Sequence, residues 1–229
     1  MLTDPPLLTI KRTWKRVDRR VLDALAGVQT GHLVDAMRGR GALDAEIKPV
    51  DPFNAQFVGS AVTCEPFADD NLAILAAVAR AEPGDVVVVA AEAFRGSAVI
   101  GDNVCLMAKN AGVRGLVVDG MVRDLDGIVQ ASVPVHARGI TPNSCVRSGP
   151  GRVGFPVVAG GRTIAPGDLV VGDRDGVVVV PAADIERIVG LLDEIRRAEA
   201  EVQAKIRTGL KTLDGVAALL ASDRIEWSD

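Results

Sequence analysis

Three charged residues in the middle of the chain have the types and spacing of a site for an anion and a hard cation. Asp102 stands in the run from Gly101 to Val104, and Arg123 and Asp124 come about twenty residues later. A carboxylate such as Asp124 can ligate Mg²⁺ or Mn²⁺ through oxygen, together with waters. Arginine presents a planar fork of donors to an oxyanion. The free amides of a helix beginning at Asp102 would receive a carboxylate or phosphate.

The elements expected between these residues bring the chain back to the same place. The sequence predicts a helix over about Asp102–Asn110 and a short buried strand over Gly115–Val118. A helix of nine or ten residues rises about 15 Å, and a strand of four or five residues returns a similar distance. Asp102, Arg123 and Asp124 should therefore share the carboxyl edge of a parallel sheet, where ligands of open α/β sheets bind. The alternative interpretation makes both aspartates helix caps and Arg123 part of a surface ion pair.

The surrounding segments predict the sheet that this site requires. We expect a strand over Phe57–Cys64, a helix over Asn71–Ala81 and a buried strand over Val86–Val89. This alternation indicates a parallel α/β unit with right-handed crossovers. Upstream, amphipathic helices are expected at Val17–Ala26 and His32–Met37.

After Pro134 the chain changes to short glycine-rich strands, and it finishes with a long helix. Strands are expected at Val157–Val158, Leu169–Val171 and Val177–Val180, and the helix at about Ala183–Arg207. Because no low-complexity linker divides the chain, we expect one domain over residues 1–229, with a helical extension at about 183–229.

The final helix contains one further candidate, Glu199. Apolar residues recur there in steps of three and four, and Glu199 occupies the step that is missing from this seam. A carboxylate in an apolar seam is costly unless it meets a cation, a donor or water. Glu199 is therefore functional, or lies where the helix has left the core, or pairs with Arg196 or Lys205. Glu201 lies off the seam, where solvation is expected.

Other kinds of catalytic site find little support. The two histidines, His32 and His136, lie far apart and in no zinc-binding spacing. The string Gly149–Gly154 fits GxGxxG, but a strand-like segment follows it where a dinucleotide fingerprint needs a helix. Three widely spaced cysteines indicate reduced, buried thiols rather than a disulfide framework.

Composition narrows the function further. The 229 residues are 48% hydrophobic and 24% charged, which suits a globular protein, and only 3% are aromatic. The net charge of −4 provides no basic field for nucleic acid. The N-terminal residues lack the basic and apolar regions of a signal peptide, and no apolar run is long enough to span a bilayer. We therefore expect a cytoplasmic protein that binds neither nucleic acid nor membrane.

These residues resemble the RraA-like family, which includes the 4-hydroxy-4-methyl-2-oxoglutarate aldolases. The resemblance rests on Asp102 and the later Arg123-Asp124, preceded by Gly115-Leu-Val-Val-Asp-Gly120. Supporting pieces are Gly59–Thr63, Asp70–Leu72, Pro83–Val89 and Asp173–Pro181. It implies an α-β-β-α sandwich resembling the swivelling phosphohistidine domain, assembled as a homotrimer or homohexamer with active sites between subunits.

The resemblance also implies a role for each candidate residue. Asp124 would hold a divalent metal cation, Mg²⁺ or Mn²⁺, Arg123 would bind substrate and the enolate oxygen, and Asp102 would orient metal-bound water. The backbone amides of the following run would receive the pyruvyl carboxylate: Gly101, Asp102, Asn103 and Val104. Glu199 is the candidate for an acidic residue supplied by the C-terminal helix of a neighbouring subunit.

The implied reaction is cleavage of a 4-hydroxy-2-oxo acid to pyruvate and a carbonyl compound, without a Schiff-base lysine. Oxaloacetate decarboxylation would be a side activity, because it passes through the same enolate. The same family contains non-catalytic regulators that inhibit a ribonuclease E-type enzyme, in which the aspartate after the arginine is replaced. Because Asp124 is present here, the resemblance favours the lyase, and the regulator is the alternative.

Overall fold

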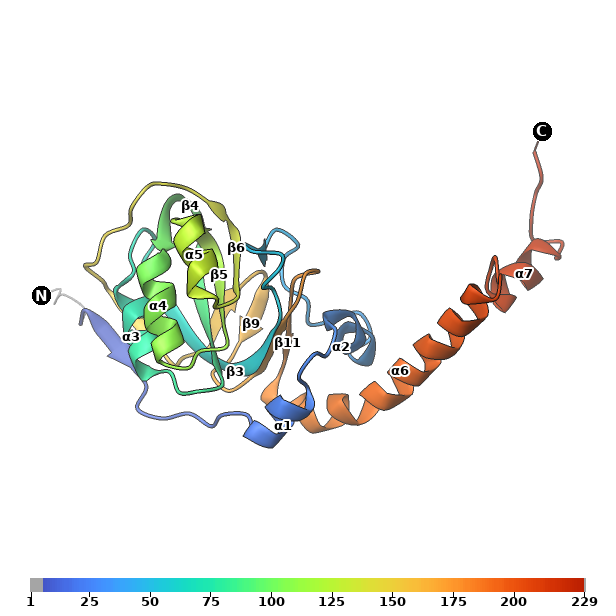
Figure 1. Cartoon of the computed structure of the whole chain (residues 1–229), viewed down its shortest axis with the longest axis horizontal. Coiled ribbons are helices and arrows are strands. Elements are labelled where there is room, and N and C mark those ends of the chain that lie inside the picture. The colour runs from blue at the N-terminus through green and yellow to red at the C-terminus, as the bar shows by residue number, and fades with distance from the viewer. Residues whose placement is uncertain (1–5, 229) are drawn as a thin grey trace, which may run out of the picture.

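The computed structural model describes residues 6–228 and shows a mixed α/β fold around one large sheet (Figure 1). The strands are β1 (Leu8–Ile10), β2 (Lys48–Pro49), β3 (Phe57–Pro66), β4 (Asp85–Ile100), β5 (Gly115–Val122), β6 (Val135–Ile140), β7 (Gly151–Val153), β8 (Val157–Ala159), β9 (Arg162–Ile164), β10 (Leu169–Gly172) and β11 (Val177–Val180). The helices are α1 (Arg19–Ala24), α2 (Thr30–Ala36), α3 (Leu72–Arg80), α4 (Asp102–Asn110), α5 (Leu125–Ala131), the 3₁₀ turn η1 (Ala182–Asp184), α6 (Ile185–Arg207) and α7 (Asp214–Leu220).

The predicted parallel unit forms the centre of the sheet. Strands β3, β4, β5 and β6 lie side by side, and each neighbouring pair is parallel. The sheet as a whole is mixed, because β3 pairs antiparallel with β10 through its first residues and with β7 through its last. Strands β8 and β9 form a separate antiparallel hairpin.

Both faces of the central strands are covered. Val87 and Val89 of β4 belong to the core beneath α3 and α4, whereas Val86 and Val88 belong to the core beneath the β8–β9 hairpin. All four valines are fully buried. Burial on both faces explains why β4 begins as a continuous apolar run instead of an alternating one. A third core joins α1, α2 and the first part of α6 to β10 and β11.

Several predicted boundaries agree with the structure to within one or two residues, including those of α3, α4 and α6. Others differ: α1 is shorter than the predicted helix, β4 continues to Ile100, and β5 continues from the predicted Val118 to Val122. The sequence did not predict α5, α7 or the short strands β1, β2, β6, β7 and β9. Strand β4 has an irregular register opposite β5, and Glu92 and Ala93 have positive φ angles of 55° and 56°. A bulge of this kind lets a polar segment interrupt an apolar strand without ending it. Because the apolar pattern stops at this segment, it does not predict the second half of β4.

Helix α6 confirms the predicted C-terminal helical extension but not a continuous buried seam. Only Ile188 and Leu192 of this helix are buried, whereas Val202 and Ile206 are 38% and 53% exposed. Figure 1 shows α6 leaving the body of the protein and α7 lying at its far end. Across residues 6–228, no helix is both long and apolar enough to cross a bilayer.

Candidate functional site

The candidate site lies at the carboxyl ends of two neighbouring parallel strands. Ile100 and Val122, the last residues of β4 and β5, are paired, and the Arg123 N–H donates to the Ile100 carbonyl at 3.0 Å. Helix α4 begins directly after β4, and α5 begins directly after Asp124. The structure therefore places the predicted helix start and the Arg123-Asp124 pair next to each other.

Gly101 allows the Asp124 side chain to lie against the start of α4. A Cβ atom added to Gly101 would be 2.6 Å from Asp124 Oδ2 and 3.4 Å from Arg123 Cγ. The backbone of Gly101 is extended, with φ −138° and ψ −169°, a conformation that any residue can adopt. A glycine is therefore required here for space, since the carboxylate fills the volume of a side chain.

Asp124 has a strained backbone, and its carboxylate does not cap the helix that follows it. Its φ of 59° and ψ of 50° are left-handed, a conformation that aspartate and asparagine tolerate better than most residues. Although Asp124 precedes α5, its side chain makes no capping hydrogen bond. Asp124 therefore occupies the N-cap position of α5 without a capping bond from its side chain, which instead forms the partly exposed ion pair with Arg123 that the alternative interpretation expects. Such strain tends to be kept where it positions a functional group.

Arg123 bridges Asp124 and a distant segment. Its Nε lies 3.2 Å from Asp124 Oδ2, and its Nη1 donates to the hydroxyl of Ser144. Ser144 lies beyond β6 and pairs with Ala98 near the end of β4. The Arg123 and Asp124 side chains are 40% and 41% exposed, so the ion pair can exchange partners with a ligand. No motif marked Ser144 in the sequence.

Asp102 is the first residue of α4 and lies between two helices. Its Oδ1 accepts a hydrogen bond from the Asn103 N–H at 2.6 Å, while Gly101 occupies the N-cap position of the helix. A Cβ atom on Gly127 of α5 would be 2.5 Å from Asp102 Cβ, so this glycine allows the two helices to approach closely. The Cys105 N–H donates to the Gly101 carbonyl, which leaves the amides from Asp102 to Val104 ahead of the helical ladder. The Asn103 amide would have to exchange its bond with Asp102 to receive an anion.

The donor set at this edge suits a hard cation held by few protein ligands. In residues 6–228, no cluster of three or more His, Cys, Asp or Glu side chains could hold a metal ion by itself. Mg²⁺ is typically bound by one or two carboxylates, with water and substrate oxygens completing its octahedron. The Asp124 carboxylate, pressed against Gly101 and close to the solvent, fits such an ion. It does not fit structural zinc, which needs four protein ligands.

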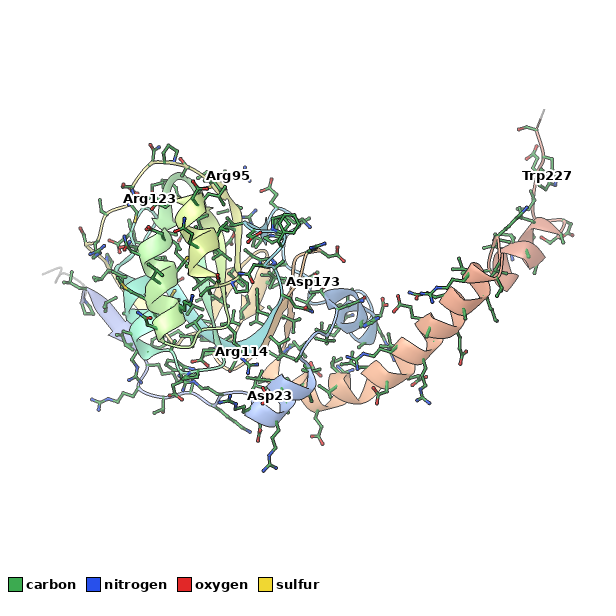
Figure 2. All side chains as sticks on the ribbon, in the orientation of Figure 1. Asp23, Arg95, Arg114, Arg123, Asp173 and Trp227 are labelled. Atoms are coloured by element: carbon green, nitrogen blue, oxygen red, sulfur yellow. The ribbon has the colours of Figure 1, made fainter. Side chains whose placement is uncertain are left out.

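Glu199 does not join this site within one chain. It lies in the exposed half of α6, where its carboxylate contacts His32 Nε2 of α2 and accepts from Gln203 Nε2 at 3.0 Å. The predicted pairing of Glu199 with Arg196 or Lys205 is therefore wrong. The alternative that the helix has left the core at this point is confirmed. In Figure 2, Arg123 lies by the tops of α4 and α5, while α6 leads away toward Trp227.

The remaining polar candidates have structural roles. Gly149–Gly154 runs into β7 and then β8, with no helix N-terminus, so the dinucleotide interpretation fails. All three cysteines are free thiols; Cys64 and Cys105 are buried as predicted, whereas Cys145 is only partly buried. Burial raises the pKa of Cys105 to about 12. His136 is fully buried beside Phe57, and burial lowers its pKa.

Comparison with known proteins identifies a family model and relatives that this chain resembles. Residues 30–179 match the family model described as "RraA-like: Aldolase/RraA". A protein of Halalkalibacterium halodurans named "Putative 4-hydroxy-4-methyl-2-oxoglutarate aldolase" is 38% identical over 180 residues, which cover 79% of this chain and 84% of that protein.

Two solved structures extend the similarity to the fold. One is Streptomyces coelicolor RraAS2, described as an unusual member of the RNase ES inhibitor RraA protein family. It is 30% identical with a TM-score of 0.73, and the match covers 83% of this chain and 99% of that one. An uncharacterised protein from Pseudomonas syringae is 27% identical with a TM-score of 0.75, covering 86% and 97%.

Proposed function

The chain belongs to the RraA-like family, and on that basis we propose that it is a divalent-metal-dependent lyase. Its substrate would be a 4-hydroxy-2-oxo acid such as 4-hydroxy-4-methyl-2-oxoglutarate, cleaved to pyruvate and a carbonyl compound. The observation that carries the proposal is the contact of Asp124 with Gly101, beside Arg123, at the carboxyl edge of the parallel strands. We also infer that the layers correspond to an α-β-β-α sandwich resembling the swivelling phosphohistidine domain.

In this proposal the residues at the carboxyl edge of the sheet bind two groups of the substrate, its carboxylate and its 2-oxo oxygen. The amides from Gly101 to Val104 would receive the substrate carboxylate, because helix N-termini attract anions. The Arg123 guanidinium would bind the 2-oxo oxygen and stabilise the negative charge that develops there during carbon–carbon cleavage. To do so it would exchange its bond with Asp124 for one with the substrate, while Ser144 keeps the guanidinium in place.

Asp124 would hold the cofactor, Mg²⁺ or Mn²⁺. When bound, such a cation supplies Lewis-acid stabilisation of the enolate charge. Asp102 would orient a water at the helix start, within reach of the substrate 4-hydroxyl, whose proton must leave for the bond to break. The same charge stabilisation would support oxaloacetate decarboxylation as a side activity.

Glu199 would complete the site from a neighbouring subunit. Val202 and Ile206 leave an apolar stretch of α6 exposed beyond Glu199, and a packed partner would bury it. We therefore propose a homotrimer or homohexamer in which Glu199 of one subunit supports proton transfer in the next. Its contact with His32 would then be given up on assembly.

The lyase proposal is tested by following pyruvate release from 4-hydroxy-4-methyl-2-oxoglutarate and from oxaloacetate, with and without chelator. We expect activity to vanish with chelator and to return with Mg²⁺ or Mn²⁺. The variant Asp124→Asn keeps the left-handed backbone but lowers the ligand charge, so turnover should be lost at an unchanged melting temperature. Full turnover in excess chelator, or in D124N, contradicts the proposal.

The shared site is tested by mixing two inactive variants, D124N and Glu199→Gln. Mixed oligomers contain some interfaces with both native residues, so subunit exchange should restore part of the activity. Glu201→Gln is the matched control and should stay active alone. If E199Q is active, or if the mixture stays inactive despite exchange shown by mass spectrometry, Glu199 does not act across the interface.

The second candidate function is a regulator of a ribonuclease E-type enzyme. It is favoured by the similarity to RraAS2, whose description names an RNase ES inhibitor family. This function predicts no pyruvate release under any metal condition and a stable complex with the ribonuclease in a pull-down. The presence of Asp124 makes it the weaker candidate.

A further inference from the structure

Four arginines surround a cavity far from the site described above. The cavity, of about 540 Å³, lies between the end of α2, strands β9 and β11, and the start of α6. Its charged lining is Arg38, Arg40, Arg162, Arg187 and one carboxylate, Asp184. Val179 on its floor belongs to the core beneath the β8–β9 hairpin, on the opposite face of the sheet from α4. The cavity is therefore separate from the Asp124 edge.

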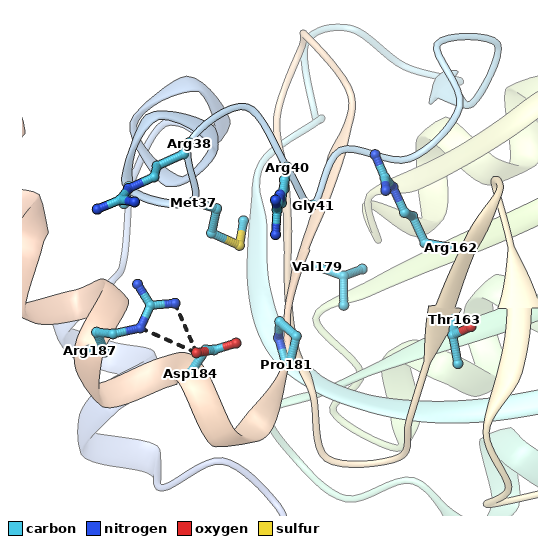
Figure 3. A pocket seen from close by; sticks show the side chains of 11 residues that line it. Met37, Arg38, Arg40, Gly41, Arg162, Thr163, Val179, Pro181, Asp184 and Arg187 are labelled. Carbon is cyan, nitrogen blue, oxygen red and sulfur yellow. Dashed lines mark hydrogen bonds and ion pairs between the residues drawn. The ribbon is translucent and has the colours of Figure 1, made fainter.

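The four arginines are spread along the lining of this cavity. Figure 3 shows Arg38 and Arg187 on one side of Met37, with Arg40 on the other side and Arg162 further along the same rim. Arg162 is held there by its Nε, which donates to the Ala42 carbonyl at 3.0 Å. Arg187 donates to Asp184 Oδ1 at 2.8 Å. Four positive charges against one carboxylate leave a net charge of about +3 in a protein whose net charge is −4.

Arg38 occupies a backbone position that usually belongs to glycine. It follows α2 with a φ of 57°. The Gly39 N–H donates to the Val34 carbonyl at 2.9 Å, closing a Schellman-type helix end. The residue after the C-cap in this motif is left-handed and is glycine in most proteins. An arginine there is strained, and strained residues of this kind cluster at ligand clamps.

We propose that this arginine cavity is a binding site for a small phosphate-bearing anion, such as pyrophosphate or a phosphate monoester. Arginine binds phosphate oxygens through its planar pair of donors, and several arginines around one space can share the oxygens of one phosphate group. A volume of about 540 Å³ falls within the range of small-molecule pockets. Asp184 and Arg187 lie at the root of α6, so the ligand would contact the base of the helix that carries Glu199.

The test is isothermal titration calorimetry of the full chain in a chelator-containing, phosphate-free buffer at low salt. Chelator removes any phosphate binding that depends on a metal at Asp124. The arms are inorganic phosphate, pyrophosphate, a sugar phosphate and citrate, which separate free phosphate from phosphate esters and phosphate from carboxylate. We expect saturable binding of at least one phosphate compound, tighter than that of citrate and weakened by salt.

Three variants of the cavity give distinct expected results. Arg40→Gln should weaken binding about tenfold or more, because a bond to a charged group is lost. Arg38→Gly should weaken it similarly while keeping or raising the melting temperature, since glycine relieves the left-handed strain. Asp184→Asn should tighten binding by removing a like charge and releasing Arg187. The Asp184 side chain makes no capping bond that this change would break.

Two controls decide the location. Arg20→Gln removes one exposed charge from α1, outside the cavity, and should leave binding unchanged. Arg123→Ala should also leave it unchanged, which separates this proposal from the lyase proposal. The proposal is overturned by an absence of heat at millimolar ligand, by loss of binding in R123A but not in R40Q, or by citrate binding as tightly as the phosphates.

Discussion

Because the Asp124 carboxylate lies against Gly101, adding one methyl group at Gly101 tests whether the position of this carboxylate matters for activity. Gly101→Ala introduces a Cβ atom 2.6 Å from Asp124 Oδ2 and 3.4 Å from Arg123 Cγ. Because the Gly101 backbone is extended, alanine fits the local conformation. The change therefore acts on the position of the two side chains and not on the fold.

The size of the displacement follows from the distances. Ordinary van der Waals contact begins at 3.4 Å, so the carboxylate has to move by at least the difference from 2.6 Å, which is 0.8 Å. A misplacement of about 1 Å at a reacting centre costs about 100-fold in rate, or about 2.7 kcal/mol of transition-state stabilisation. Since Asp124 is 41% exposed, it can move without repacking the core. The free energy of unfolding should change by less than about 1 kcal/mol.

The assay combines turnover, metal binding and stability. We expect kcat/KM for pyruvate release to fall about 100-fold in G101A, with weaker Mn²⁺ binding by calorimetry and a nearly unchanged urea midpoint. Gly190→Ala is the matched control, because a Cβ atom there meets nothing within 4 Å. It should leave turnover and metal binding as they are.

Native turnover and Mn²⁺ affinity in a folded G101A would refute the reasoning. The Asp124 carboxylate would then not act from its position against the helix start. Loss of activity together with a large loss of stability would refute it too, since the contact would be structural.

Two further predictions concern the buried polar groups of the fold. Arg138, whose side chain is 6% exposed, pairs with the buried Asp119; Arg138→Ala leaves that carboxylate uncompensated and should lower the free energy of unfolding by about 3–5 kcal/mol. In Arg95→Ala, which breaks only an exposed pair with Glu46, the loss should stay below about 1 kcal/mol; equal losses in urea denaturation would contradict this. Burial lowers the pKa of His136 below its usual 6.5, so the unfolded chain takes up a proton before the folded one does, and stability should decline as pH falls through this range. In His136→Gln the urea midpoint should depend less on pH between pH 6.5 and the range in which carboxylates titrate. Parallel plots of urea midpoint against pH for the native protein and the variant would show that His136 does not contribute.

Local patterns were sufficient to predict the elements that carry the site. The boundaries of α4 and the start of β5 follow from apolar periodicity and glycine stops. Asp102 and Arg123 lie at the same sheet edge as predicted, although β5 has eight residues and not the four or five on which the length argument relied. These features depend on residues close in sequence. By contrast, α5 was missed, because its seven residues include Gly127, which weakens a helical pattern. The close α4–α5 approach at Asp102 is the reason for that glycine.

The sequence by itself determined the parallel unit, the long final helix and the residues of the candidate lyase site, because periodicity and spacing encode local geometry. Only the tertiary structure decided how their side chains are arranged. Ser144 reaches Arg123 through an irregular segment beyond β6, Glu199 lies on a helix that has left the core, and four arginines from three separate segments line one cavity. Such contacts depend on where distant parts of the chain pack, and no spacing along the sequence specifies them.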